Sequence, residues 1–170
     1  MVIDWIHFPL HPDTPAQGLE LAELFRGRDL ESMQKVMQER MRDAGLAYGE
    51  RSRTYNSRLA QELAKWAVTQ AGGGAIHAAL FRAYFVYDLN LASIDALVDI
   101  AAGIGLDAAA ASQVLEQRSF SPQVERDWHL SRELGITGVP AFLAGNQLLV
   151  GCQPFPVLEE FVRYVQELNV

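Results

Sequence analysis

The spacing of apolar residues changes along the chain and divides it into three parts. Residues 2–8 alternate in character and are rich in aromatic and β-branched side chains, which predicts a strand. Three prolines within residues 9–15 then exclude a helix or a paired strand. Apolar residues recur at helical spacing from residue 29 to 134, and short apolar runs return after residue 135. We therefore expect a strand, a block of helices and a second region with strands.

Capping residues and glycines divide the helical block into separate helices. Asp29 is the expected N-cap of a helix over residues 30–44, and Asn56 that of a helix over residues 57–71. The same signals predict further helices over residues 75–87, 93–103, 107–117 and 122–134. Residues 18–28, before the block, are expected to be a weakly ordered connection with a helical turn at 19–25.

Residues 141–150 carry the pattern of a β-hairpin. Two short apolar runs, 141–144 and 147–150, are joined by the dipeptide Gly-Asn, which is typical of a tight hairpin turn. A last helix is expected to open at Pro154 or Pro156. The predicted order is therefore strand, helices, hairpin and helix, and this uncommon order is more informative than any single motif.

The composition adds few constraints. The chain has 170 residues, of which 49% are hydrophobic and 21% charged, as in an ordinary globular protein. No apolar run reaches the roughly 18 residues that a membrane span needs. The first residues lack a basic segment followed by a long apolar stretch, so we expect a cytoplasmic location. The net charge of −7, with scattered basic residues, argues against nucleic-acid binding.

The cysteine and histidine content restricts the possible chemistry. Cys152 is the one cysteine of the 170 residues, so they form no internal disulfide and no cysteine-based metal cluster. Of the four histidines only His7 and His11 are close in sequence, and they flank Pro9, which suits a loop better than a pair of metal ligands. We expect no metal site, and no histidine lies in the context of a Ser-His-Asp triad.

Several motifs, in the same order, resemble those of one known family. They are Val-Ile-Asp-Trp-Ile-His-Phe-Pro-Leu-His-Pro-Asp-Thr-Pro at 2–15, Asn-Ser-Arg-Leu-Ala at 56–60, Ala-Leu-Phe-Arg-Ala-Tyr-Phe at 79–85, Gly-Ile-Thr-Gly-Val-Pro-Ala-Phe at 135–142 and Gly-Cys-Gln-Pro at 151–154. The sequence is thereby similar to the DsbA-like thioredoxin-fold oxidoreductases of the FrnE type. The resemblance spans nearly the whole chain.

The resemblance implies the fold class and its division into domains. It implies an α/β, thioredoxin-like fold with an inserted all-helical domain, in which the first strand and helix of the family are missing. Residues 1–28 and 135–170 are expected to form the partial thioredoxin-like domain, and residues 29–134 the inserted helical domain.

The resemblance also implies a binding site at Gly138, Val139 and Pro140. It implies a cis peptide bond before Pro140, which leaves the backbone N–H and C=O of Val139 exposed to pair with an extended peptide or with glutathione. The alternative is an ordinary proline at the start of a strand, because cis peptide bonds before proline are infrequent.

The family's Cys-x-x-C motif, which lies at the start of its first helix, has no counterpart here. Dithiol exchange needs an attacking thiolate and a resolving thiol, and Cys152 cannot serve as both. Without the first strand, the sheet is expected to have unpaired edges. They could be covered by a different strand arrangement, a second copy of the chain in a homodimer, or a separate polypeptide. Alternatively, the natural protein carries the motif upstream of residue 1.

Three further residues are candidates for the site, each with a structural alternative. Cys152 is expected to be a small buried hydrophobe, because free cysteine is among the most buried residue types, with a mixed-disulfide or resolving role as the alternative. His7 is expected to end a strand and could instead face the groove. Asn56 is expected to cap a helix, although an asparagine in this region faces glutathione in relatives. Trp5 and Phe8 are expected in the core.

Three functions follow from this sequence. The leading prediction is a member of the DsbA/FrnE-type thiol-disulfide oxidoreductases that is redox-inactive because the Cys-x-x-C is absent. The second is a glutathione-dependent isomerase or transferase of the kappa-like branch, although the serine that holds glutathione there is also missing. The third is a non-enzymatic module that binds a peptide, or assembles, through the Val139–Pro140 groove. No cofactor is expected, apart from a possible glutathione.

Overall fold

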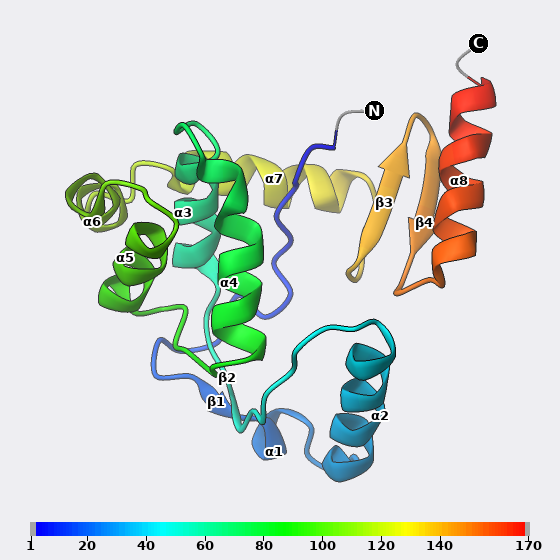
Figure 1. Ribbon diagram of the computed structural model, residues 1–170, viewed down its shortest axis with the longest axis horizontal. Coiled ribbons are helices and arrows are strands. Elements are labelled where there is room, and N and C mark those ends of the chain that lie inside the picture. The colour runs from blue at the N-terminus through cyan, green and yellow to red at the C-terminus, as the bar shows by residue number, and fades with distance from the viewer. Residues whose placement is uncertain (1–2, 169–170) are drawn as a thin grey trace. The chain divides into compact units, whose positions relative to one another are not determined.

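The computed structural model describes residues 3–168, and their elements are labelled in Figure 1. Helices predominate, and the strands are short. The elements in chain order are β1 (Leu19–Glu20), α1 (Leu21–Leu24), α2 (Leu30–Asp43), β2 (Arg53–Thr54), α3 (Arg58–Ala67), the 3-10 turn η1 (Gly73–Ala75), α4 (Ile76–Phe85), α5 (Ile94–Gly103), α6 (Ala108–Glu116), α7 (Ser121–Glu133), β3 (Ala141–Ala144), β4 (Gln147–Val150) and α8 (Phe155–Leu168).

The chain forms two compact units, which are described separately. The helical unit comprises residues 11–125, and the hairpin unit comprises the chain up to Leu10 and from Arg126 on. The boundary after Glu125 falls within α7. The division expected from the sequence, with boundaries after residues 28 and 134, stays a prediction.

Each helix predicted in the central block is present, and side-chain caps explain where three of them begin. Asp29 accepts a hydrogen bond from the Ser32 N–H at 3.0 Å, as predicted for the N-cap of α2. Ser93 and Asp107 cap α5 and α6 in the same way. Because these caps act within three residues of the chain, they could be identified from the sequence.

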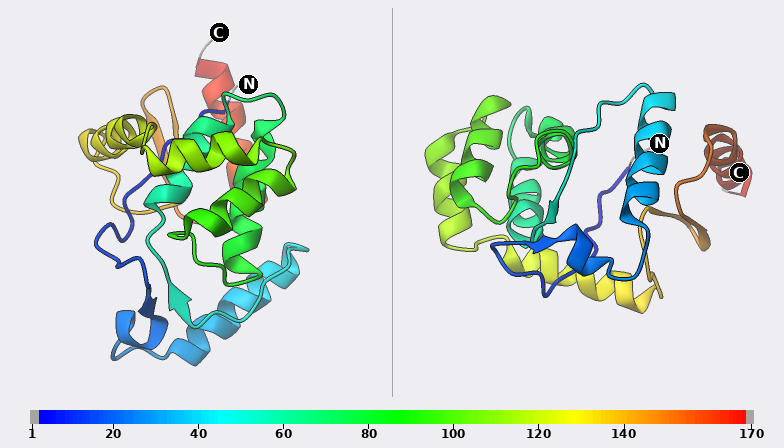
Figure 2. Two further views of the ribbon diagram at one scale, coloured as in Figure 1. Left: turned by 90° about the vertical axis from the view of Figure 1, so that its left-hand side faces the viewer. Right: turned by 90° about the horizontal axis from the view of Figure 1, so that it is seen from below.

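Helices α3 to α6 enclose the core of the helical unit. The green helices lie side by side in both views of Figure 2, and each of the four contacts at least two of the others. Four of the core's largest side chains are 0% exposed: Leu63, Ile76, Leu97 and Leu115. Each such burial contributes about 1.5–3 kcal/mol relative to an exposed side chain. This core holds α3 to α6 together.

A buried carboxylate also lies in the helical unit. The Glu62 side chain is 0% exposed and accepts two hydrogen bonds from Arg118, at 2.7 Å from Nε and 2.6 Å from Nη2. Arg58 Nε lies 3.3 Å from the same carboxylate, and Arg58 also pairs with Glu125. The hydrogen bond to Glu62 raises the pKa of the Arg118 guanidinium above its ordinary value. This network joins α3 to the chain that follows α6, and the sequence did not predict it.

The expected weakly ordered connection at 18–28 contains more structure than predicted. The helical turn is present as α1, and β1 before it pairs antiparallel with β2, with Leu19 opposite Thr54. Both strands have two residues, too few for an alternating pattern to appear in the sequence.

The hairpin unit contains β3, β4 and α8, together with the later part of α7. The two strands have the predicted bounds and pair antiparallel, with Ala141 opposite Val150 and Ala144 opposite Gln147. Gly145 in the turn takes a left-handed φ of 59°, as a tight hairpin turn requires. The peptide bond between Val139 and Pro140, just before β3, is cis.

The strand predicted over residues 2–8 is wrong for the part that the structure describes. Val2 lies outside the described residues, and residues 3–8 have no strand hydrogen bonding. Their main chain is instead held by α7, where the Asp127 carboxylate accepts a hydrogen bond from the His7 N–H at 2.8 Å. A strand needs a neighbouring strand as well as a suitable pattern, and β3 and β4 pair only with each other within residues 3–168.

Candidate functional site

The turn before β3 leaves a backbone position open for hydrogen bonding. Within residues 3–168, no group is hydrogen-bonded to the N–H or C=O of Val139, and its residue surface is 49% exposed. The carbonyl of Pro140 is used by the hairpin itself, because it accepts a hydrogen bond from the Gly151 N–H at 2.8 Å. Val139 is therefore the first residue before β3 whose backbone can pair with another chain. A Cβ at Gly138 would meet no atom within 4 Å, so the approach is open there too.

The hairpin presents apolar side chains around this position. Phe142, Leu143, Leu148 and Val150 are between 38% and 47% exposed. Among the described residues, each strand has a neighbour on one side only. An open strand edge beside exposed apolar side chains is the usual geometry for binding an extended peptide by strand addition.

Cys152 is exposed, so the prediction that it is buried is wrong. The residue follows the end of β4, where Gly151 takes a left-handed φ of 91° and turns the chain out of the strand. No element of the hairpin covers this turn, and the residue's apolar character therefore did not determine its burial. Since Gly151 is hydrogen-bonded to Pro140, Cys152 lies at the same end of the hairpin as the cis peptide.

His7 has its main chain fixed on both sides. Its N–H donates to Asp127, and its carbonyl accepts a hydrogen bond from the Ser131 hydroxyl at 3.3 Å. Asp127 and Ser131 are both buried on α7, which explains how the sequence positions His7. Trp5, two residues earlier, is 53% exposed, so its predicted place in the core is wrong, and Phe8 is half-buried.

Asn56 lies in the helical unit and uses its amide for structure. Its Nδ2 donates to the carbonyls of Pro12 and Thr14, at 2.9 and 2.8 Å, and its Oδ1 accepts from the Arg58 N–H at 2.9 Å. The N-cap prediction is wrong by one residue. Ser57 stands at the N-cap position without a side-chain cap hydrogen bond, and Asn56, the residue before it, accepts from the first N–H of α3. The carboxamide also holds the proline-rich loop against the start of α3. A contact between Asn56 and a ligand stays a prediction.

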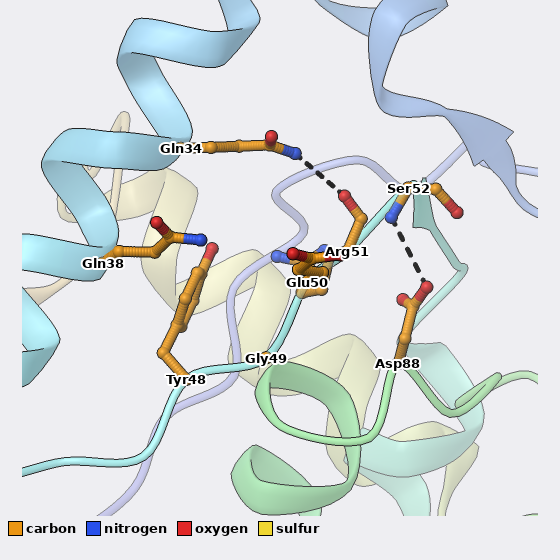
Figure 3. A pocket seen from close by; sticks show the side chains of 8 residues that line it. All are labelled: Gln34, Gln38, Tyr48, Gly49, Glu50, Arg51, Ser52 and Asp88. Atoms are coloured by element: carbon orange, nitrogen blue, oxygen red, sulfur yellow. Dashed lines mark hydrogen bonds between the residues drawn. The ribbon is translucent and has the colours of Figure 1, made fainter.

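The structure contains a cavity that the sequence did not predict. It has a volume of about 390 Å³ and lies within the helical unit, between α2, residues 48–52 and Asp88 (Figure 3). Its lining comes from three separate stretches of the chain, and no short motif marks it. Among residues 3–168, no group of three or more His, Cys, Asp or Glu side chains could hold a metal ion. No helix in the same range is long and apolar enough to cross a membrane.

The chemistry available to these residues is limited by the thiol count. Dithiol exchange needs two thiols, one to attack and one to resolve the mixed disulfide. Residues 1–170 contain Cys152 alone. The hairpin unit can therefore present a backbone pairing site and one exposed thiol, but these residues do not supply a dithiol.

The comparisons with known sequences give one family. The model of the DSBA-like thioredoxin domain matches residues 1–163. The uncharacterised protein YwbO of Bacillus subtilis (strain 168) is 34% identical over 85 residues, which is 49% of this chain and 42% of that protein. The matched part of this chain thus covers less than half the length of that relative.

The solved structures agree with the family. A probable DsbA oxidoreductase from Streptomyces coelicolor has a TM-score of 0.84 and 25% identity, over 93% of this chain and 72% of that one. A 2-hydroxychromene-2-carboxylate isomerase has a TM-score of 0.71 and 17% identity, over 92% of this chain and 80% of that one. The cytosolic disulfide reductase DsbM from Pseudomonas aeruginosa has a TM-score of 0.51 and 22% identity, over 82% and 81%.

These matches confirm the fold class expected from the sequence, a thioredoxin-like α/β fold with a helical insertion. The family match extends over the cis Val139–Pro140 turn, the hairpin and most of α8. The chain belongs to the family of DSBA-like thioredoxin domains.

Proposed function

We propose that this chain is a FrnE-type member of the DsbA-like thiol-disulfide oxidoreductases that binds a peptide or a small thiol but does not carry out dithiol exchange with its own residues. The observation that carries the proposal is the turn at Val139 and Pro140, where an unpaired backbone position lies at the same end of the hairpin as Cys152.

An extended peptide is the occupant that fits the hairpin best. Its backbone pairs with the N–H and C=O of Val139, and its apolar side chains cover part of the exposed surface of β3 and β4. Gly138 leaves room for this approach. The main role of Pro140 is positional, because it fixes the backbone of the preceding residue, whereas its own carbonyl already pairs with Gly151.

The exposed thiol adds one covalent step. The Cys152 thiolate attacks a disulfide of the bound molecule, one of that molecule's sulfurs leaves as a thiolate, and a mixed disulfide remains on Cys152. Its release needs an external thiol, because residues 1–170 offer no resolving cysteine. The chain therefore captures disulfides stoichiometrically and does not turn them over alone.

Insulin reduction tests the redox part of the proposal. We expect this chain and its Cys152→Ser variant to give the same rate of insulin reduction. Both rates should equal that of the thiol reductant alone. Robust turnover by these 170 residues would contradict the claim of inactivity.

Peptide binding tests the backbone site. The variant Val139→Pro removes the N–H, whereas Val139→Ala keeps both backbone groups and shortens only the side chain. With a fluorescent cysteine-containing peptide, we expect V139P to weaken binding about 3- to 10-fold more than V139A does, the effect of one lost hydrogen bond. If the two variants bind the peptide with equal affinity, the proposed hydrogen bond to the Val139 N–H is wrong.

A glutathione-dependent isomerase or transferase is the second candidate. It rests on the likeness to 2-hydroxychromene-2-carboxylate isomerase, which at 17% identity concerns the fold alone. Saturable glutathione binding at micromolar affinity, lost in V139P, would favour it over peptide binding.

We further propose a cytoplasmic location and, as the alternative to a bound peptide, a homodimer in which a second copy covers the open hairpin edges. A cytosolic setting suits the structural neighbour DsbM, named as a cytosolic disulfide reductase. In the absence of a peptide, the open edges and exposed apolar side chains of the hairpin could pair with the same surface of a second copy. Light scattering after gel filtration tests it, and a monomer at micromolar concentration would exclude the dimer.

A further inference from the structure

The cavity of the helical unit is lined almost entirely by polar side chains. Its volume of about 390 Å³ lies within the range of small-molecule sites. In Figure 3 the Gln34 and Gln38 amides extend from α2 towards residues 48–52, and Asp88 lies on the other side of that segment. All of these groups belong to the helical unit, whereas the hairpin site belongs to the other unit.

Arg51 brings a positive charge to the cavity without a counter-ion. Its guanidinium carbon lies 3.9 Å from the ring centroid of Tyr84 and 5.1 Å from that of Phe85, within the range of cation–π contacts. Nη2 donates a long hydrogen bond, 3.3 Å, to the Arg53 carbonyl. Nε is buried and has no partner, and no carboxylate within residues 3–168 forms a salt bridge with this guanidinium. A half-buried cation is normally paired with an anion, so we expect a ligand of this cavity to place an anionic group beside Arg51.

Asp88 contributes a negative charge to the same cavity, and its carboxylate lacks a strong hydrogen-bond donor. Its Oδ2 accepts only a long hydrogen bond, 3.4 Å, from the Ser52 N–H, and its Oδ1 is buried without a partner. The residue takes a left-handed φ of 51°, which aspartate tolerates better than most residues. A buried carboxylate oxygen without a donor is costly, so Asp88 calls for a cationic donor.

The wall that carries these groups is fixed by the fold. The Gly49 N–H donates to the Phe85 carbonyl at 2.9 Å, and a Cβ on Gly49 would lie 2.2 Å from the carbonyl oxygen of Val86. Gln34 Nε2 donates to the carbonyl of Arg51 at 2.9 Å. These contacts hold residues 49–52 between α2 and the end of α4. A ligand therefore meets groups that are already in place, which lowers the entropy cost of binding.

We propose that this cavity binds a small zwitterion of the α-amino-acid class, a polar amino acid or a dipeptide. The ligand's carboxylate pairs with the guanidinium of Arg51, and its ammonium pairs with the carboxylate of Asp88. The charges favour this class over others. Glu50 is a second carboxylate on the lining, so phosphate or sulfate would meet two negative groups for one positive group, whereas a simple cation would leave Arg51 unpaired. The amides of Gln34 and Gln38 suit a polar side chain.

A panel of the free amino acids and of simple dipeptides, added to the full chain, tests the proposal. At a 100-fold excess over Kd, we expect a matching ligand to raise Tm by about 5–10 °C, and calorimetry then gives the affinity. The proposal is overturned if no member of the panel binds saturably below about 10 mM, or if inorganic phosphate or sulfate binds more tightly than every amino acid.

Two variants test the assignment of the two charges. Asp88→Asn keeps the size and the tolerance for a left-handed φ but removes the negative charge, and Arg51→Lys removes the planar fork of donors. We expect each to weaken binding about 10-fold or more. Arg82→Lys is the matched control, because Arg82 stacks on Tyr87 at 5.4 Å and does not line the cavity. Its affinity should stay within about twofold of the unmodified chain, well below the effect of one charged contact.

Modified ligands identify which charge meets which residue. N-acetylation removes the ligand's ammonium and amidation removes its carboxylate, and both should weaken binding to the unmodified chain. In D88N the effect of N-acetylation should vanish, and in R51K the effect of amidation should shrink. If both modifications act equally in all variants, the assignment is wrong. The readout does not involve the hairpin, so V139P should bind the zwitterion normally whether or not the proposed peptide binding is correct.

Discussion

The helical unit and the hairpin unit differ in how many of their apolar side chains are buried. Among the residues that the structure describes, every buried apolar side chain except Trp128 lies between residues 21 and 124, in the helical unit. In the hairpin unit, Phe155 is 74% exposed, Ile3 68% and Trp5 53%. The helical unit thus has a closed core, whereas the described part of the hairpin unit has exposed apolar surface and open strand edges. Proteins usually cover such edges, and this difference between the two units is the reason for proposing that the hairpin binds a peptide.

The largest expected effect compares a core leucine with a hairpin leucine. Leu63 is 0% exposed, and Leu63→Ala should lower the free energy of unfolding by about 2–5 kcal/mol, through lost burial and the cavity left behind. Leu143 is 47% exposed, and Leu143→Ala should cost less than about 1 kcal/mol. Urea unfolding measures both. Similar losses in the two variants would mean that the hairpin is covered as well as the helical core is.

A smaller effect is expected from the buried carboxylate of the helical unit. Glu62→Gln keeps the size but removes the charge that Arg118 and Arg58 share. Because the Arg118 side chain is 45% exposed and water can solvate it, we expect a loss of about 2 kcal/mol, below that of a fully buried pair. The variant Glu116→Gln changes the exposed partner of Ser112 and serves as the control, with little effect. An equal loss in both would contradict a special role for the Glu62 network.

Helix capping should have a smaller effect again. Asp107 accepts a hydrogen bond from the Ala110 N–H at 2.7 Å, and Asp107→Ala should cost about 1 kcal/mol. Asp107→Asn, which retains the accepting oxygen, should recover most of this. The same urea experiment measures both variants. If the alanine and asparagine variants have the same free energy of unfolding, the cap does not stabilise the helical unit.

The pH dependence of stability involves His77 on α4. Burial, with a contribution from the charge of Lys65, lowers the pKa of the imidazole below its ordinary value. As pH falls through the ordinary pKa of histidine, the unfolded chain takes up a proton before the folded chain does, so stability should fall. His77→Gln should reduce this slope between pH 7.5 and pH 5.5, whereas a change at the exposed His129 serves as the control. A slope unchanged in H77Q would show that other groups cause it.

The smallest difference between the folded and the unfolded chain is expected in the reactivity of the Cys152 thiol. Because Cys152 is exposed, a thiol reagent such as DTNB should label it in the folded chain within about tenfold of its rate in urea. Labelling that is slower by orders of magnitude would mean that a second copy or another element covers this end of the hairpin. The measurement thus also bears on the proposed dimer.

Much of the fold could be predicted because its signals are local. Asp29, Ser93 and Asp107 act within three residues, and the Gly-Asn turn fixes the register of β3 and β4. The predicted strand at the N-terminus failed for the opposite reason. Its pattern of side chains suits a strand, but its main chain is held by Asp127 and Ser131, more than 100 residues away.

The sequence by itself thus determined the helices, the hairpin, the family and the single thiol. Only the tertiary structure decided that Cys152 is exposed and that Glu62 is buried between two arginines. Only it decided that Arg51 and Asp88 line one cavity with α2. Periodicity, caps and turns depend on residues that are close in the chain, so they can be predicted from the sequence. Burial and the meeting of distant charges depend on which surfaces cover one another, and that is settled only when the elements pack.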